Sequence, residues 1–108
     1  MASRIYYRAN TFLQKRHRAY TRHLCQCRYR REEFELTLQD WSDFWPDALT
    51  WSQRGRSVNS LCMTRLDPEK PWSRTNCCLV TRENQLKIKN ARISGKDTTK
   101  YFLLARTL

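Results

Sequence analysis

Residues 61–89 read LCMTRLDPEKPWSRTNCCLVTRENQLKIK, and their order of apolar runs and breakers predicts two strands followed by a helix. Residues 61–66 form a short apolar-rich run that stops at an Asp-Pro pair, and residues 77–80 form a second one. Two prolines and a tryptophan fill residues 68–72, a composition that favours a turn. Thr81 follows the second run as a good helix N-cap, because its hydroxyl accepts from an amide one turn later.

The helix expected after these strands has signals at both ends. Glu83 falls in its first turn, where the helix dipole favours a negative charge. Gly95 is the residue type that most often ends a helix in the left-handed conformation. One face of the helix is expected to carry Leu86, Asn90 and Ile93. The predicted unit is therefore strand, strand, helix over about 30 residues.

The motif TRLD, followed after the loop by NC and LVTRENQ, resembles the core of HNH endonucleases. It is most similar to a phage-type branch of that family that reads LDRID…YSPENCRWATRKEQ. The likeness covers residues 37–92, because DWSDFWPDAL also resembles the helical segment that precedes the core in that branch. The matching core residues are Arg65, Leu66, Asp67, Ser73, Asn76, Cys77, Thr81, Arg82 and Gln85.

The resemblance implies DNA handling, because HNH modules set a metal ion and a base against the scissile phosphate. It implies catalytic positions at Arg65, Asp67 and Asn76, with Arg65 stabilising a phosphate charge. Asp67 and Asn76 would be the ligands of a weakly held Mg²⁺. Glu83 or Asn84 would supply a last polar position on the helix.

The chain departs from the HNH pattern at the end of the first strand. The family has a histidine there as general base, often beside an aspartate that binds the metal, whereas this chain has Arg65 and Thr64. Arg65 is shared with the phage-type branch, but Thr64 is not. A guanidinium keeps its proton near neutral pH, and a threonine hydroxyl is a poor ligand for a hard cation. The expected activity is therefore binding, with cleavage weak or lost.

Net charge points to a polyanionic partner. The 108 residues include 21 Lys and Arg against 10 Asp and Glu, a formal charge of +11. Residues 1–31 contain no acidic residue, residues 32–53 contain no basic one, and residues 54–108 are again strongly basic. Cationic surfaces bind nucleic acid by releasing its counterions. The resemblance to HNH endonucleases then favours DNA over RNA, and together with the charge it gives the expected contacts: Arg18, Arg22, Arg54, Arg56, Arg65, Arg82, Lys87, Lys89 and Arg92.

Residues 5–31 predict one long basic helix with an apolar stripe, because apolar residues recur at spacings of three, four and seven. The stripe consists of Phe12, Leu13, Ala19, Tyr20, Leu24 and Cys27. His17 and His23 would lie on opposite sides of this helix, where they are expected to be solvated or to contact phosphate.

The five cysteines favour reduced, buried thiols in a reducing compartment, which predicts a cytoplasmic protein, or one of the host cytoplasm if phage-encoded. The Arg-rich amino terminus leaves a mitochondrial transit peptide as a minor alternative. No apolar run approaches the roughly 20 residues of a membrane span. A zinc site is an alternative use of the thiols, although C-x-C and C-C differ from zinc-knuckle spacing. Its ligands would be Cys25, Cys27, Cys77 and Cys78.

Residues 32–60 predict an acidic, Trp-rich segment. Alternation at Phe34, Leu36 and Leu38 favours a strand or an extended linker. A short helix would follow, capped by Thr37 or Asp40 and ended near Phe44 by Pro46. The expected core anchors are Trp41, Trp45 and Trp51. Residues 53–59 read as a flexible basic loop suited to contact with a nucleic-acid backbone, or as a solvated turn, and residues 101–105 are apolar enough to return to the core.

The predicted architecture is a small single α+β domain with an HNH-like ββα core. Its parts are a basic helix (1–31), the acidic Trp-rich helical segment and loop (32–60), the core (61–95) and a tail (96–108). The favoured function is nucleic-acid binding on a degenerate HNH scaffold. The alternatives are an active metal-dependent DNA endonuclease and a phage accessory protein that binds a host enzyme or the ribosome.

Overall fold

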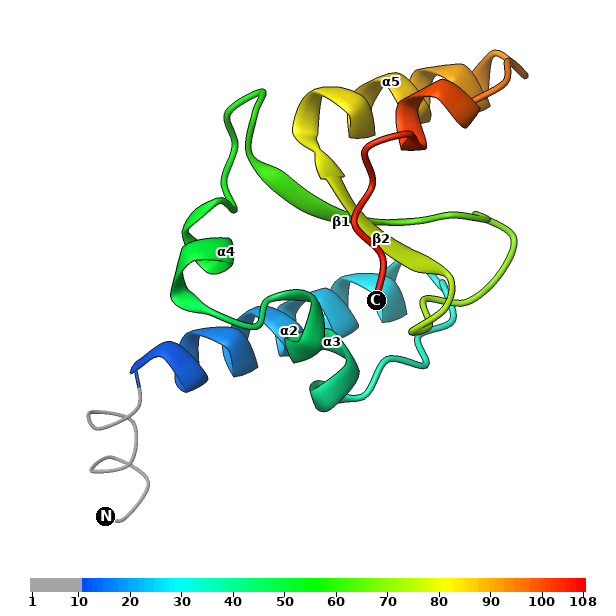
Figure 1. The fold of residues 1–108 in the computed structure, drawn as a ribbon. Coiled ribbons are helices and arrows are strands. Elements are labelled where there is room, and N and C mark those ends of the chain that lie inside the picture. The colour runs from blue at the N-terminus through cyan, green and yellow to red at the C-terminus, as the bar shows by residue number, and fades with distance from the viewer. Residues whose placement is uncertain (1–10) are drawn as a thin grey trace.

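The computed structural model describes residues 11–108, which form a small α+β domain (Figure 1). The part of the predicted basic helix before residue 11 lies outside the described residues. The described elements are α2 (Thr11–Tyr29), α3 (Leu38–Phe44), α4 (Ala48–Ser52), β1 (Leu61–Arg65), β2 (Cys77–Thr81), α5 (Arg82–Ile93) and the 3₁₀ helix η1 (Thr99–Phe102). No helix within residues 11–108 is long and apolar enough to cross a membrane.

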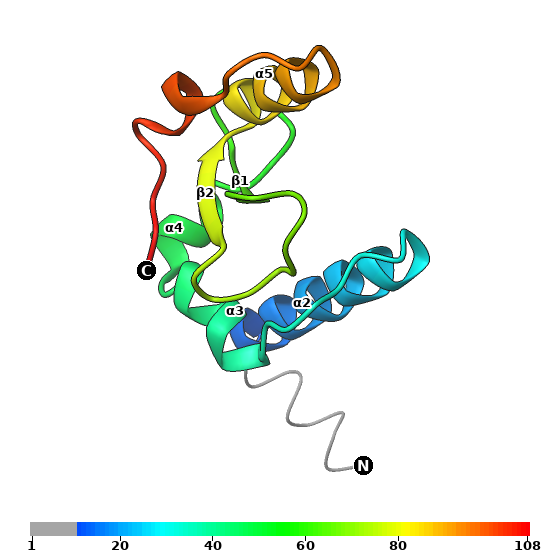
Figure 2. The same ribbon diagram turned by 90° about the vertical axis from the view of Figure 1, so that its right-hand side faces the viewer.

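The strands β1 and β2 pair antiparallel, with Leu61 opposite Thr81 and Arg65 opposite Cys77. Alternation along both strands gives the hairpin two apolar faces. Figure 2 shows the hairpin between α2 and α3 on one side and α5 on the other. The face toward α2 and α3 carries Leu61, Met63, Cys77 and Leu79. The face toward α5 and η1 carries Cys62, Cys78 and Val80, packed on Ile88.

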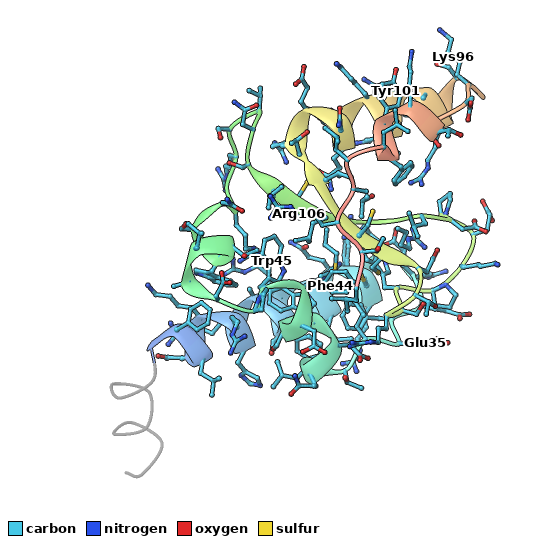
Figure 3. All side chains as sticks on the ribbon, viewed as in Figure 1. Glu35, Phe44, Trp45, Lys96, Tyr101 and Arg106 are labelled. Atoms are coloured by element: carbon cyan, nitrogen blue, oxygen red, sulfur yellow. The ribbon has the colours of Figure 1, made fainter. Side chains whose placement is uncertain are left out.

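The larger core cluster is aromatic, as predicted. Trp41 and Trp45 are almost fully buried, and Trp51 packs against them half-buried. Figure 3 shows Phe44 and Trp45 within the body of the molecule, whereas Glu35 and Lys96 lie at its edge. The tryptophans are therefore core anchors.

Helix α3 begins and ends where its capping residue and its proline predict. The Thr37 hydroxyl accepts from the amide of Asp40, and the Asp40 carboxylate accepts from the amide of Thr37, a reciprocal capping box. The helix ends at Phe44, two residues before Pro46. Before α3, the extended linker makes an isolated parallel bridge between Phe34 and Trp72.

Helix α5 begins and ends where the sequence predicts. The amide of Asn84 donates to the Thr81 hydroxyl at 3.2 Å, and Gly95 has a φ of +69°. The face that carries Leu86, Asn90 and Ile93 is exposed to solvent: Leu86 is 45% exposed and Ile93 is 75% exposed. Ile88 and Ala91 are buried instead, because the second face of the hairpin already presents Cys78 and Val80 to the Ile88 side of the helix.

The carboxyl-terminal tail returns to the core, as predicted. Tyr101, Phe102 and Ala105 pack against the smaller cluster, and Arg106 makes an antiparallel bridge with Leu79. The tail therefore covers part of the α5 face of the hairpin.

Candidate nucleic-acid interface

An open groove of about 1130 Å³ lies between α2, the loop after α4, strand β1 and helix α5. Figure 2 shows α2 and α5 on opposite sides of β1, and the residues of β1 line the floor of the groove. Among the residues that the structure describes, Glu32 is the only carboxylate in the lining. The basic lining residues are Arg22, Arg30, Arg54, Arg56, Arg65, Arg82, Lys89 and Arg92.

Most of the predicted nucleic-acid contacts therefore meet in one place. Arg18 and Lys87 do not line the groove, and Lys87 pairs with Glu83 at 3.3 Å. Arg30 lines it but was not predicted. Arg30 lies in the turn directly after α2, eight residues after Arg22, and this spacing is the signal that could have identified it.

Arg65 is held by protein groups on the groove floor. Its Nη2 lies 3.1 Å from a carboxylate oxygen of Glu32, its guanidinium is 5.1 Å from the Trp72 ring centroid, and its side chain is only 14% exposed. Glu32 also pairs with Arg30 at 3.6 Å and accepts from the Trp72 indole at 3.2 Å. Arg65 is therefore the ion-pair partner of Glu32 on the groove floor, and its expected role at a phosphate stays a prediction.

Asn76 is buried and binds its own loop. Its Oδ1 accepts from the Asp67 amide at 2.9 Å, and its Nδ2 donates to the carbonyls of Asp67 and Pro71 at 2.9 Å each. The Asp67 carboxylate accepts from the Glu69 amide at 2.9 Å. The predicted catalytic and Mg²⁺-binding residues thus lie at one end of the hairpin, with the Asn76 side-chain oxygen already accepting a hydrogen bond.

Arg92 closes the carboxyl end of β1. Its Nη2 donates to the carbonyls of Arg65 and Leu66 at 2.9 and 3.2 Å, and its guanidinium lies 5.9 Å from the Phe102 ring centroid. Burial lowers the pKa of Arg92, and Arg65 lowers it further. Arg92 therefore lines the groove while its guanidinium donates hydrogen bonds to these two backbone carbonyls.

The Arg54 side chain packs against the tryptophans of the core. Its guanidinium lies 4.4 Å from the ring centroid of Trp51, 5.1 Å from that of Trp45 and 5.5 Å from that of Trp41. Gly55 permits this approach: its φ is +157°, and a Cβ there would stand 2.9 Å from the Ser60 hydroxyl. Burial lowers the pKa of Arg54, and the charge of Arg22 lowers it further.

His23 is a core residue, which corrects the expectation that it is solvated. Its Nδ1 accepts from the Trp41 indole at 3.2 Å, and its ring centroid lies 4.4 Å from that of Trp72. Burial lowers the pKa of His23 to about 4, and Arg30 is the next cause. Because Nδ1 accepts, the neutral ring carries its proton on Nε2 and lacks a free basic nitrogen. His17 is exposed.

The cysteines proposed as zinc ligands are not brought together. Cys77 and Cys78 are adjacent on β2 and point to opposite faces, while Cys25 is exposed. Burial raises the pKa of Cys27 to about 11 and that of Cys77 to about 12. All five are free thiols, and within residues 11–108 no three His, Cys, Asp or Glu side chains gather as a metal site.

Comparison with protein-family models, with curated proteins and with solved structures found no match for this chain. Most of the charged side chains that line the groove are those of arginine and lysine. These provide fixed positive charge and hydrogen-bond donors, a combination that suits an anionic polymer.

Proposed function

We propose that this protein binds nucleic acid, DNA in preference to RNA, through the cationic groove, and that cleavage is weak or lost. The observation that carries the proposal is the composition of the groove: eight basic side chains and one acidic side chain line it. A groove of one charge sign concentrates the opposite charge and speeds its capture.

The HNH-like scaffold belongs to the same proposal. Its support is the order of β1, β2 and α5, together with the motif residues that fall on them. Asn76 and Arg82, both part of the motif, lie in the loop between the strands and at the first position of the helix.

Weak or absent cleavage is proposed because, among the described residues of the groove, the candidate proton acceptors are already engaged. The Arg65 guanidinium has hydrogen-bond donors only and offers no acceptor. The Nδ1 of His23 is already an acceptor, and the Glu32 carboxylate is engaged by Arg30, Arg65 and Trp72. Each candidate proton acceptor is therefore either a cation or already bound to another side chain of the protein.

The binding test is a salt titration with a DNA duplex and an RNA of the same length. The affinity is expected to fall steeply as salt rises, because each neutralised phosphate releases counterions. The variant Arg56→Gln/Lys89→Gln, which changes two exposed groove residues, should weaken binding about tenfold and flatten the salt slope. A matched control is Lys70→Gln/Lys96→Gln, which changes two exposed lysines outside the lining. Equal losses in the two double variants would contradict binding in the groove.

The cleavage test is plasmid nicking with Mg²⁺ or Mn²⁺, with wild type and Asp67→Ala. No nicking is expected from either protein. Nicking by wild type that Asp67→Ala abolishes would establish the endonuclease alternative instead. A pull-down from host lysate that survives nuclease treatment, with no salt-dependent binding to either nucleic acid, would favour the accessory-protein alternative.

A further inference from the structure

The arginines on the groove floor differ in the groups that their guanidiniums contact. Arg65 has the Glu32 carboxylate, and Arg92 has two strand carbonyls. The Arg54 guanidinium is half-buried against three indole rings, and within residues 11–108 it has no carboxylate or carbonyl acceptor. Indole faces attract a cation but leave the in-plane N–H groups of the fork unused.

A second cation stands near Arg54. Arg22 of α2 lines the same groove as Arg54, and its charge, after burial, lowers the pKa of Arg54. The one carboxylate of the groove, Glu32, is engaged by Arg30, Arg65 and Trp72. Two neighbouring guanidinium groups with no carboxylate between them are stabilised by an anion that both can contact.

We propose that Arg54 and Arg22 form a seat for one phosphate group, and that in the nucleic-acid complex this group belongs to the sugar-phosphate backbone. This inference rests on the proposed function and deepens it. The three tryptophans fix the plane of the Arg54 fork, so that its N–H groups are oriented before the phosphate arrives. A planar fork matches two phosphate oxygens, whereas a lysine ammonium is a point charge.

The seat fixes position and carries no base recognition. The indoles of Trp41 and Trp45 are buried beneath Arg54, so they are not available as stacking platforms for bases. Contacts to phosphate set register on the strand without reading its sequence. Loss of the seat should therefore weaken binding equally for oligonucleotides of different sequence.

The test uses intrinsic tryptophan fluorescence, since three of the four tryptophans surround Arg54. The probes are a DNA oligonucleotide and inorganic phosphate, titrated separately into the full chain. Both should change the emission of wild type at saturation. Arg22→Gln, which changes an exposed side chain, should weaken both titrations about tenfold. Arg54→Lys, which keeps the charge, should weaken them as much, because it removes the fork.

The matched control is Arg28→Gln, an equal loss of charge at an exposed position of α2 outside the groove lining. It should change the oligonucleotide affinity by less than about twofold. Equal losses in Arg28→Gln and Arg22→Gln would overturn the seat, even with wild-type binding intact. Oligonucleotide binding that leaves the emission unchanged would also overturn it. A phosphate response without oligonucleotide binding would retain the seat and refute the proposed function.

Discussion

Arg65 and Glu32, 33 positions apart in the chain, form an ion pair of 3.1 Å on the floor of the cationic groove. The same carboxylate accepts from the Trp72 indole, so one acidic residue joins the linker after α2 to β1 and to the loop between the strands. Glu32 therefore stabilises the fold and also reduces the positive potential of the groove.

Glu32→Gln separates these two effects. Loss of the charge should lower the free energy of unfolding by about 1–2 kcal/mol, because Arg65 loses its counterion in a mostly buried position. The same change should tighten oligonucleotide binding a few-fold, because it removes a negative charge from the groove. Denaturant unfolding and a binding titration measure the two effects.

Glu33→Gln is the matched control, since Glu33 is exposed, adjacent and absent from the groove lining. It should leave both quantities nearly unchanged. If Glu33→Gln tightened binding as much as Glu32→Gln, the effect would be one of overall net charge and not of the groove.

The buried imidazole of His23 predicts acid sensitivity. Its pKa is lowered from 6.5 to about 4 by burial, so between these values the unfolded chain binds a proton that the native protein does not. The stabilisation is complete above pH 6.5 and is lost as the pH falls through about 4, to a total of about 3 kcal/mol. His23→Gln should flatten this slope between pH 6.5 and 4.5, as measured by thermal unfolding. His17→Gln, at an exposed position, should retain the wild-type slope.

Asn76→Asp tests whether the loop between the strands depends on one amide. The aspartate would place a carboxylate oxygen against the carbonyls of Asp67 and Pro71, where Nδ2 now donates. The cost should be at least about 2–3 kcal/mol of unfolding free energy, because two donors are lost and a buried charge is added. Asn59→Asp at an exposed position should cost less than about 0.5 kcal/mol.

Gly95 ends α5 in the left-handed region, with a φ of +69° and open space where a Cβ would stand. Gly95→Ala should therefore lower the free energy of unfolding by about 1 kcal/mol, through backbone strain alone. Gly95→Asn should cost less, because asparagine tolerates this conformation. Equal losses in the two variants would point to a cause other than backbone conformation.

Thiol chemistry should single out Cys25, the exposed cysteine of α2. Burial raises the pKa of Cys62 and of Cys78 to about 11, and the other buried thiols are shifted in the same direction. Because the thiolate is the reactive species, a disulfide reagent at pH 7.5 should modify one thiol quickly and the others only on unfolding. The fast phase should be absent from Cys25→Ser. A fast phase that persists in this variant would show that a second thiol is accessible.

Signals that fix the ends of helices act over a few residues and could be identified in the sequence alone. Thr37, Thr81 and Gly95 act on backbone groups of their own helix ends, and Pro46 lacks the amide that a longer α3 would need. Charge segregation was equally visible, and most of the basic residues that it singled out do line one groove. The apolar runs and breakers of residues 61–80 predicted two strands, but not which face of their hairpin would receive each side of α5.

Whether each groove residue is paired, stacked or desolvated depends on packing between segments that are distant in the chain. Arg65 is neutralised by Glu32, His23 is desolvated by Trp72 and Phe34, and Arg54 is held by indoles from α3 and α4. The sequence shows an arginine in the same way whether its guanidinium is paired with a carboxylate, stacked on an indole or able to bind an anion. Its availability depends on which acceptors and apolar surfaces lie within a few ångströms, and that neighbourhood is set when the helices pack on the hairpin.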